Sequence, residues 1–157
     1  MKPKIHRLLL SCEDIWEASL VLAEWSHDLP PVVRRALLIA AIVSYCRPFT
    51  TNYGPGALRK LDIADYLKAD HSSDRPLLEL HQVLMHLRDK VVAHSDFDVQ
   101  PVTLGARTTT GFTFDRLKVD VLMAPISIDD FRRLCSIVQS RCTDEMHRLA
   151  NDLMPPP

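Results

Sequence analysis

Residues 74–96 read DRPLLELHQVLMHLRDKVVAHSD, and the predicted fold rests on this stretch. Asp74 is suited to cap a helix N-terminus, and Pro76 falls in the first turn, where its missing N–H is tolerated. The apolar residues recur at alternating steps of three and four, which is one stripe of a helix: Leu77, Leu80, Leu84, Leu87 and Val91. The pattern predicts a core-facing helix that extends to about Ala93.

Two helices are predicted before this stretch. Ser11 with Asp14 resembles a capping box, so the first helix should run from Ser11 to about Ser26. The buried stripe expected on it consists of Ile15, Ala18, Leu22 and Trp25.

Pro31 can begin the second helix, which is apolar on nearly every side and continues to Cys46. Pro48 ends it, which leaves Arg47 in the last turn, where a cation complements the helix dipole. After a loop rich in threonine and glycine, residues 58–67 are expected to form a short helix.

The part of the chain after Asp96 has a different pattern. Apolar and polar residues alternate over about 100–123, which predicts a β-hairpin with a bulge near Asp115–Arg116, where the alternation slips by one residue. Ser127 with Asp130 then resembles a capping box for a long last helix. Its expected buried stripe consists of Phe131, Leu134, Cys135, Val138, Cys142, Leu149 and Leu153.

The predicted fold is therefore a mostly α, up-and-down bundle of about four main helices, with a β-hairpin inserted before the last helix. The length of 157 residues suits a single domain over 1–157, with a frayed tail at 154–157. The apolar content of 46% and the net charge of -1 are those of an ordinary globular protein, with no global electrostatic footprint for nucleic acid.

The cysteines do not form a metal-binding pattern. No CxxC pair occurs among the four, and Cys135 and Cys142 are spaced to share a helix face, which indicates core packing rather than a metal site or a disulfide. No signal peptide or membrane span is evident, because the longest apolar run is far shorter than the roughly 20 residues that a bilayer requires. A cytoplasmic protein with no membrane partner, metal or cofactor is expected.

The densest cluster of chemically useful side chains lies at the end of the organising helix. Arg88 is followed by the polar residue Asp89 and, after five intervening residues in all, by His94. This pattern, at the end of a long helix in a small helical bundle, resembles the signature of the HEPN superfamily. The resemblance implies a metal-independent endoribonuclease of toxin or phage-defence type, with RNA or a nucleotide as ligand and, for some members, a protein antitoxin as partner.

In such a site, the resemblance implies that His94 acts as general base or acid and that Arg88 holds the scissile phosphate. Asp89 would orient one of them, or simply cap the local hydrogen bonding. Six helical residues turn through about 600° and rise about 9 Å, so one regular helix leaves Arg88 and His94 about 120° apart. A homodimer resolves this, because two copies of the motif can meet across a twofold axis. Asp96 stands where many antitoxin-paired members have a tyrosine, which counts against that subtype.

Each of these residues also has a plainer interpretation. Arg88 fits a solvated residue paired with Asp89 or Glu79, and His94 fits a helix C-cap. His81 lies one heptad before Arg88 and is a weaker candidate for substrate binding, with surface or interface packing as the alternative. Arg47 is a second weaker candidate for a phosphate contact, with helix capping as the alternative. For the whole chain, the alternatives are a non-catalytic HEPN-like module that binds a nucleotide, RNA or a partner, and a purely structural dimerisation domain.

Overall fold

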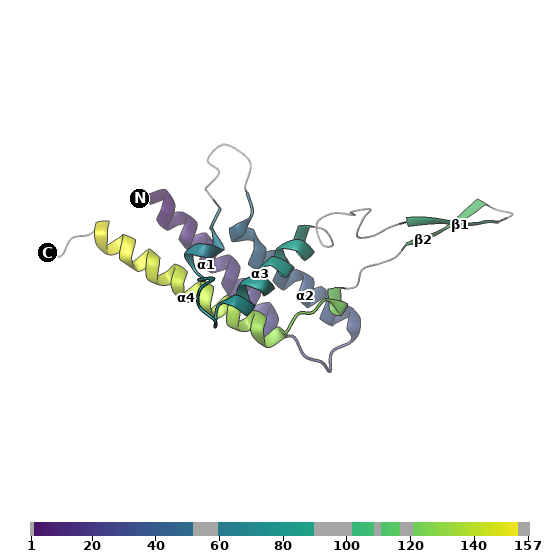
Figure 1. The fold of residues 1–157 in the computed structure, drawn as a ribbon, viewed down its shortest axis with the longest axis horizontal. Helices are drawn as coiled ribbons and strands as arrows, with labels where there is room; N and C mark the ends of the chain where they lie inside the picture. The colour runs from purple at the N-terminus through teal and green to yellow at the C-terminus, as the bar shows by residue number, and fades with distance from the viewer. Residues whose placement is uncertain (1, 52–59, 90–101, 109–110, 117–120, 154–157) are drawn as a thin grey trace.

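Four helices pack together, as the sequence predicts (Figure 1). The computed structural model describes residues 2–51, 60–89, 102–108, 111–116 and 121–153. The helices are α1 (Lys2–Ala23), α2 (Pro31–Cys46), α3 (Arg75–Leu87) and α4 (Ile128–Leu153). Helices α1 and α4 run side by side in opposite directions, so the first and last described residues lie at the same end of the bundle.

The core lies between these helices. Helix α1 packs against α2 and α4, and α3 packs against α2 and α4. Tyr45 is fully buried near its centre and meets the ring of Phe131 edge-on, with 5.4 Å between ring centroids. Cys135 and Cys142 are buried, so the prediction that they serve in core packing is confirmed.

Helix α1 begins nine residues earlier than predicted, at Lys2 rather than Ser11. Leu8 is buried and extends the apolar stripe toward the N-terminus, so packing continues the helix through Ser11. The Ser11 hydroxyl does not cap; it donates to the carbonyl oxygen of Arg7, one turn earlier, at 2.7 Å. Trp25 lies beyond the end of α1 and is half-buried, so its place in the helical stripe was also predicted wrongly.

The predicted limits of α2 are confirmed at both prolines. The helix begins at Pro31 and ends at Cys46, where a short 3₁₀-helix, η1 (Arg47–Phe49), follows. The buried guanidinium of Arg7 donates from α1 to the carbonyl oxygens of Arg47 and Pro48. A cation from another helix thus satisfies carbonyl groups at the carboxyl end of α2.

Asp74 precedes α3 but does not cap it, contrary to the prediction. Among the described residues it makes no side-chain cap hydrogen bond; its carboxylate instead accepts from the Lys68 backbone N–H at 2.9 Å and from Arg141 Nη1 at 3.3 Å. The hydrogen bond from Lys68 and the Arg141 guanidinium hold the pKa of Asp74 below its usual value. Asp74 therefore ties the connection before α3 to α4.

The short helix predicted at residues 58–67 is mostly absent from the described part of that segment. Residues 60–67 contain only a 3₁₀-helix, η2 (Ile63–Asp65), and residues 52–59 lie outside the described residues. The Asp62 carboxylate accepts from the Ala64 N–H at 3.0 Å and caps the start of this single turn.

Two strands, β1 (Val102–Thr108) and β2 (Gly111–Arg116), form an antiparallel pair. The pairing shifts between Leu104 and Arg107 on β1, not near Asp115–Arg116 on β2 as predicted.

A third 3₁₀-helix, η4 (Val121–Met123), precedes α4. Ser127 Oγ accepts from the Asp130 N–H at 3.2 Å, which confirms the predicted helix start. The predicted stripe of α4 is buried from Phe131 to Leu149, but Leu153 in the last turn is exposed. None of the helices in the described ranges is both long and apolar enough to cross a bilayer.

Candidate functional site

The Arg88–Asp89 pair lies directly after the last residue of α3. The buried leucines Leu80, Leu84 and Leu87 fix the rotation of the helix, and Arg88 follows them out of the core. Arg88 Nη1 donates to Asp89 Oδ1 at 2.7 Å. The Arg88 side chain keeps 34% of its surface exposed, so its guanidinium remains accessible to a ligand beside this carboxylate.

His94 lies outside the described residues, so the predicted meeting of Arg88 and His94 stays a prediction. The regular α-helix extends to Leu87, and Arg88 and Asp89 continue it in π-helical geometry. The predicted helix end near Ala93 lies outside the described residues. A π-helical turn is wider than an α-helical one, so the angle and rise calculated from a regular helix do not apply beyond Leu87.

Arg88 and Asp89 lie near the carboxyl end of α2. Burial raises the pKa of the Cys46 thiol to about 12, and the nearby charges of Arg88 and Asp89 act on it in opposite directions. Cys46 is the last residue of α2, and Arg47 follows it. The structure therefore brings the two arginines that the sequence singled out to the same end of the bundle.

Arg47 contacts α1 through two carboxylates. Its Nη1 donates to Glu17 Oε2 at 2.8 Å and to Asp14 Oδ1 at 3.3 Å, and Glu17 also accepts from the Ser44 hydroxyl at 3.0 Å. Half of the Arg47 side-chain surface is exposed, so these ion pairs contribute little stability. To bind a phosphate, Arg47 would have to leave both carboxylates, so this geometry favours a tie between α1 and α2.

His81 lies in the core and not on the accessible surface near Arg88. Its Nδ1 is hydrogen-bonded to the Tyr45 hydroxyl at 2.9 Å, and its ring meets that of Phe49 edge-on at 4.7 Å between centroids. Burial lowers the pKa of His81 to about 4 and raises that of Tyr45 well above its usual value. His81 is thus held neutral among aromatic side chains, which favours packing over substrate binding.

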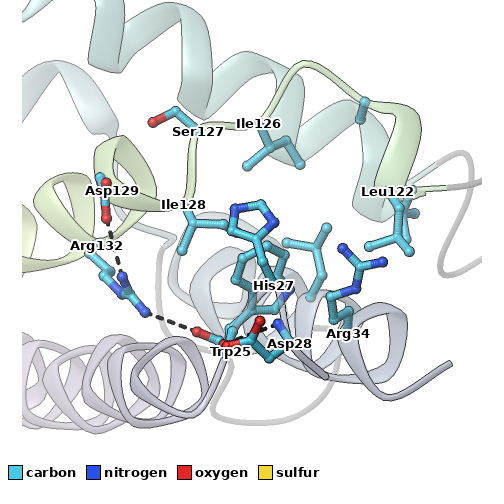
Figure 2. A pocket seen from close by; sticks show the side chains of 14 residues that line it. Trp25, His27, Asp28, Arg34, Leu122, Ile126, Ser127, Ile128, Asp129 and Arg132 are labelled. Atoms are coloured by element: carbon cyan, nitrogen blue, oxygen red, sulfur yellow. Dashed lines mark hydrogen bonds and ion pairs between the residues drawn. The ribbon is translucent and has the colours of Figure 1, made fainter. Parts of the chain in front are cut away.

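A second feature, a cavity of about 710 Å³, lies near the opposite end of α2 (Figure 2). Its walls come from the segment after α1, the first turns of α2, and the segment between η4 and α4. Two arginines, Arg34 and Arg132, line this cavity.

Arg132 forms a hydrogen-bonded wall of the cavity. Its Nη2 donates to the carbonyl oxygens of Leu22 at 2.6 Å and of Trp25 at 3.3 Å, and its Nη1 contacts Asp129 at 3.1 Å. Arg132 therefore caps the carboxyl end of α1 from the first turns of α4. No local sequence signal marks this role, because the donor and its acceptors are more than 100 positions apart.

The described residues contain no group of three or more His, Cys, Asp or Glu side chains arranged to hold a metal ion. Comparisons of the chain with protein-family models, with curated proteins and with solved structures found no match.

Proposed function

We propose that this chain is a metal-independent endoribonuclease of toxin or phage-defence type, which cuts RNA with Arg88 and His94 at a site shared by the two subunits of a homodimer. One observation carries the proposal: the guanidinium of Arg88 is accessible at the end of α3 in a four-helix bundle, with Asp89 at 2.7 Å. A partly exposed arginine with a polar neighbour, directly after a helix anchored in the core, supports the arginine half of the motif.

The proposed reaction is attack by a ribose 2′-OH on the adjacent phosphate. The 2′-oxygen forms a bond to phosphorus, His94 of one subunit takes the 2′ proton, and the bond to the 5′-oxygen breaks. His94 of the other subunit, in its protonated form, returns a proton to that leaving oxygen. The products are a 2′,3′-cyclic phosphate and a 5′-hydroxyl, and DNA is spared because it lacks the attacking group.

Arg88 contributes electrostatics to this reaction. Its planar guanidinium suits a phosphate oxygen pair and stabilises the charge that grows on the phosphate during attack. Asp89, already bonded to Arg88 Nη1, orients the guanidinium before substrate arrives. Arg47 has no part in the proposed reaction, because Glu17 and Asp14 already engage its guanidinium.

The proposal requires a second copy of the chain, and α1 offers a surface for it. Opposite its core-facing stripe, α1 carries exposed apolar residues on one face: Leu9, Trp16 and Leu20. Trp16 lies two turns after Leu9, and Leu20 lies one turn after Trp16. An exposed apolar stripe of this kind is typical of a protein contact surface. Burying it between two subunits would accompany the formation of the shared site.

The test is cleavage of a short RNA by the purified chain in EDTA, beside the same sequence carrying 2′-O-methyl groups throughout. We expect cleavage of the RNA alone, and its loss in Arg88→Ala and in His94→Ala. Arg133→Ala, which removes an exposed arginine from α4, is the matched control and should cut normally. Cleavage of the methylated strand, or equal cleavage by all variants, would rule out the proposed mechanism.

The second candidate is a non-catalytic module that binds RNA, a nucleotide or a partner protein such as an antitoxin through the same surface. The ion pair between Arg88 and Asp89 favours it, because Arg88 Nη1 is already engaged by a carboxylate. It predicts that Arg88→Ala folds normally and loses binding, while the wild-type chain never cuts RNA.

A further inference from the structure

The cavity of Figure 2 is separate from the proposed ribonuclease site. It opens at the first turns of α2, whereas Arg88 and Arg47 lie at the carboxyl end of that helix. Arg47 follows Arg34 by thirteen positions, which corresponds to about 20 Å along a helix axis. A ligand in the cavity would therefore not touch Arg88. The volume of about 710 Å³ lies within the range that small-molecule sites occupy.

One side of the cavity is apolar. The carbon-rich surface comes from α2, η4, the segment leading into α4 and the first residue of α4, through Leu38, Leu122, Ile126 and Ile128. Trp25 and His27 close the cavity on the side of α1, with their rings edge-on at 4.7 Å between centroids. These side chains would contact the hydrocarbon body of a ligand.

The same walls contain hydrogen-bond donors that lack acceptors. Trp25 Nε1 and Arg34 Nε are both buried, and neither has a hydrogen-bond partner among the described residues. Within the described part of the chain, the terminal nitrogens of Arg34 also form no ion pair or hydrogen bond, and Figure 2 shows its guanidinium at the cavity, on the side of Leu122. A partly buried arginine without an acceptor is unfavourable until an anion supplies one.

The carboxylates near the cavity do not fill this role. Asp129 is paired with Arg132, whose other nitrogens are committed to the carboxyl end of α1. Asp28 is exposed to solvent and forms no ion pair with Arg34 among the described residues. Arginine and the indole N–H can only donate, so the missing group must be an acceptor.

We propose that this cavity binds a small amphipathic organic anion, with its carboxylate on the guanidinium of Arg34 and its apolar body against Leu122 and Ile126. The carboxylate forms a charge-assisted pair with Arg34, and the body removes apolar surface from water. The walls are already in place, since Arg132 fixes the end of α1 and Ser127 fixes the start of α4. This inference does not depend on ribonuclease activity.

The test uses 4-phenylbutyrate as the probe and 4-phenylbutyramide as its neutral counterpart, followed by the indole N–H signals in ¹⁵N-correlated NMR spectra. The chain has two tryptophans, so the spectrum contains its own control: Trp25 lines the cavity, and Trp16 is exposed on α1. We expect saturable movement of the Trp25 signal with the acid and no movement of the Trp16 signal. The acid should bind roughly tenfold or more tightly than the amide.

Arg34→Gln should lower the affinity for 4-phenylbutyrate to that for 4-phenylbutyramide. Arg133→Gln should change neither of these affinities. Both variants are checked for folding by circular dichroism, and the comparison of acid with amide on the wild-type chain remains decisive if Arg34→Gln does not fold. Equal affinity for acid and amide, equal movement of both indole signals, or no saturable binding would each overturn the proposal.

Discussion

Acidification should destabilise the bundle through His81, the buried histidine beside Tyr45. Burial lowers the pKa of His81 from its ordinary value of 6.5 to about 4, so the folded chain keeps this ring neutral at pH values where the unfolded chain protonates it. The unfolded state then binds more protons than the folded state. The contribution of the neutral His81 to the free energy of unfolding is therefore fully present above the unfolded pKa of 6.5. It is lost as the pH falls from 6.5 toward 4.

The magnitude follows from the size of this window. One pKa unit corresponds to about 1.4 kcal/mol, so about 2 kcal/mol should be lost by about pH 5 and about 3 kcal/mol near pH 4. For a single domain whose total stability is on the order of 5–15 kcal/mol, a loss of about 2 kcal/mol is readily measured.

The assay is urea unfolding at about pH 7 and about pH 5, at one protein concentration, for the wild type, His81→Gln and His147→Gln. His81→Gln should be less stable at neutral pH, because it removes packing against Tyr45. It should also lack the part of the decrease in unfolding free energy between the two pH values that His81 causes. His147 is exposed on α4, so His147→Gln should keep the wild-type change. If wild type and His81→Gln lose the same free energy on acidification, the reasoning about His81 is refuted.

Three further predictions concern the core, the cap and the outer face of α1. Leu84→Ala should cost about 2–5 kcal/mol of unfolding free energy, because Leu84 is fully buried. Leu20→Ala, at a half-exposed site, should cost less than about 1 kcal/mol. Similar losses for the two variants in urea unfolding would contradict this prediction. Arg132→Met should cost about 1–3 kcal/mol by freeing the carbonyls at the end of α1, with Arg133→Met near zero as the control in the same assay. Trp16→Glu should shift sedimentation velocity profiles toward monomer, and an unchanged dimer would exclude this face of α1 as the contact.

The parts of the fold that local chemistry decides were predictable from the sequence. Pro31 and Pro48 gave the limits of α2 because proline acts on its own neighbours, and Ser127 gave the start of α4 because its cap lies three residues away. The leucine stripe of α3 was also predictable, since periodicity of 3.6 residues needs no tertiary information.

Side chains whose partners are distant in sequence were not predictable. Ser11 and Asp74 have the residue types of helix caps, yet one bonds back within α1 and the other ties Lys68 to Arg141 of α4. His81 shares a heptad face with Arg88, but Tyr45, 36 residues earlier, holds it in the core. Such contacts depend on how the helices pack, and sequence spacing along one helix carries no information about them.

For the candidate site, the sequence identified Arg88 and Asp89, and the structure places them together and accessible at the end of α3. The sequence did not identify the cavity at the start of α2, because Arg34, Trp25 and Ile126 come from segments that meet only in the folded chain. The two sites lie at opposite ends of one helix, so their tests are independent.

The central claim concerns the chemistry at Arg88 and His94, and the ends of the RNA products test it most directly. Cleavage in EDTA by attack of the 2′-OH leaves a 2′,3′-cyclic phosphate on one fragment and a 5′-hydroxyl on the other, which mass spectrometry distinguishes. The proposal predicts these ends from the wild-type chain and uncut RNA from Arg88→Ala. Fragments ending in a 3′-hydroxyl and a 5′-phosphate, or intact RNA after incubation with the wild-type chain, would contradict it.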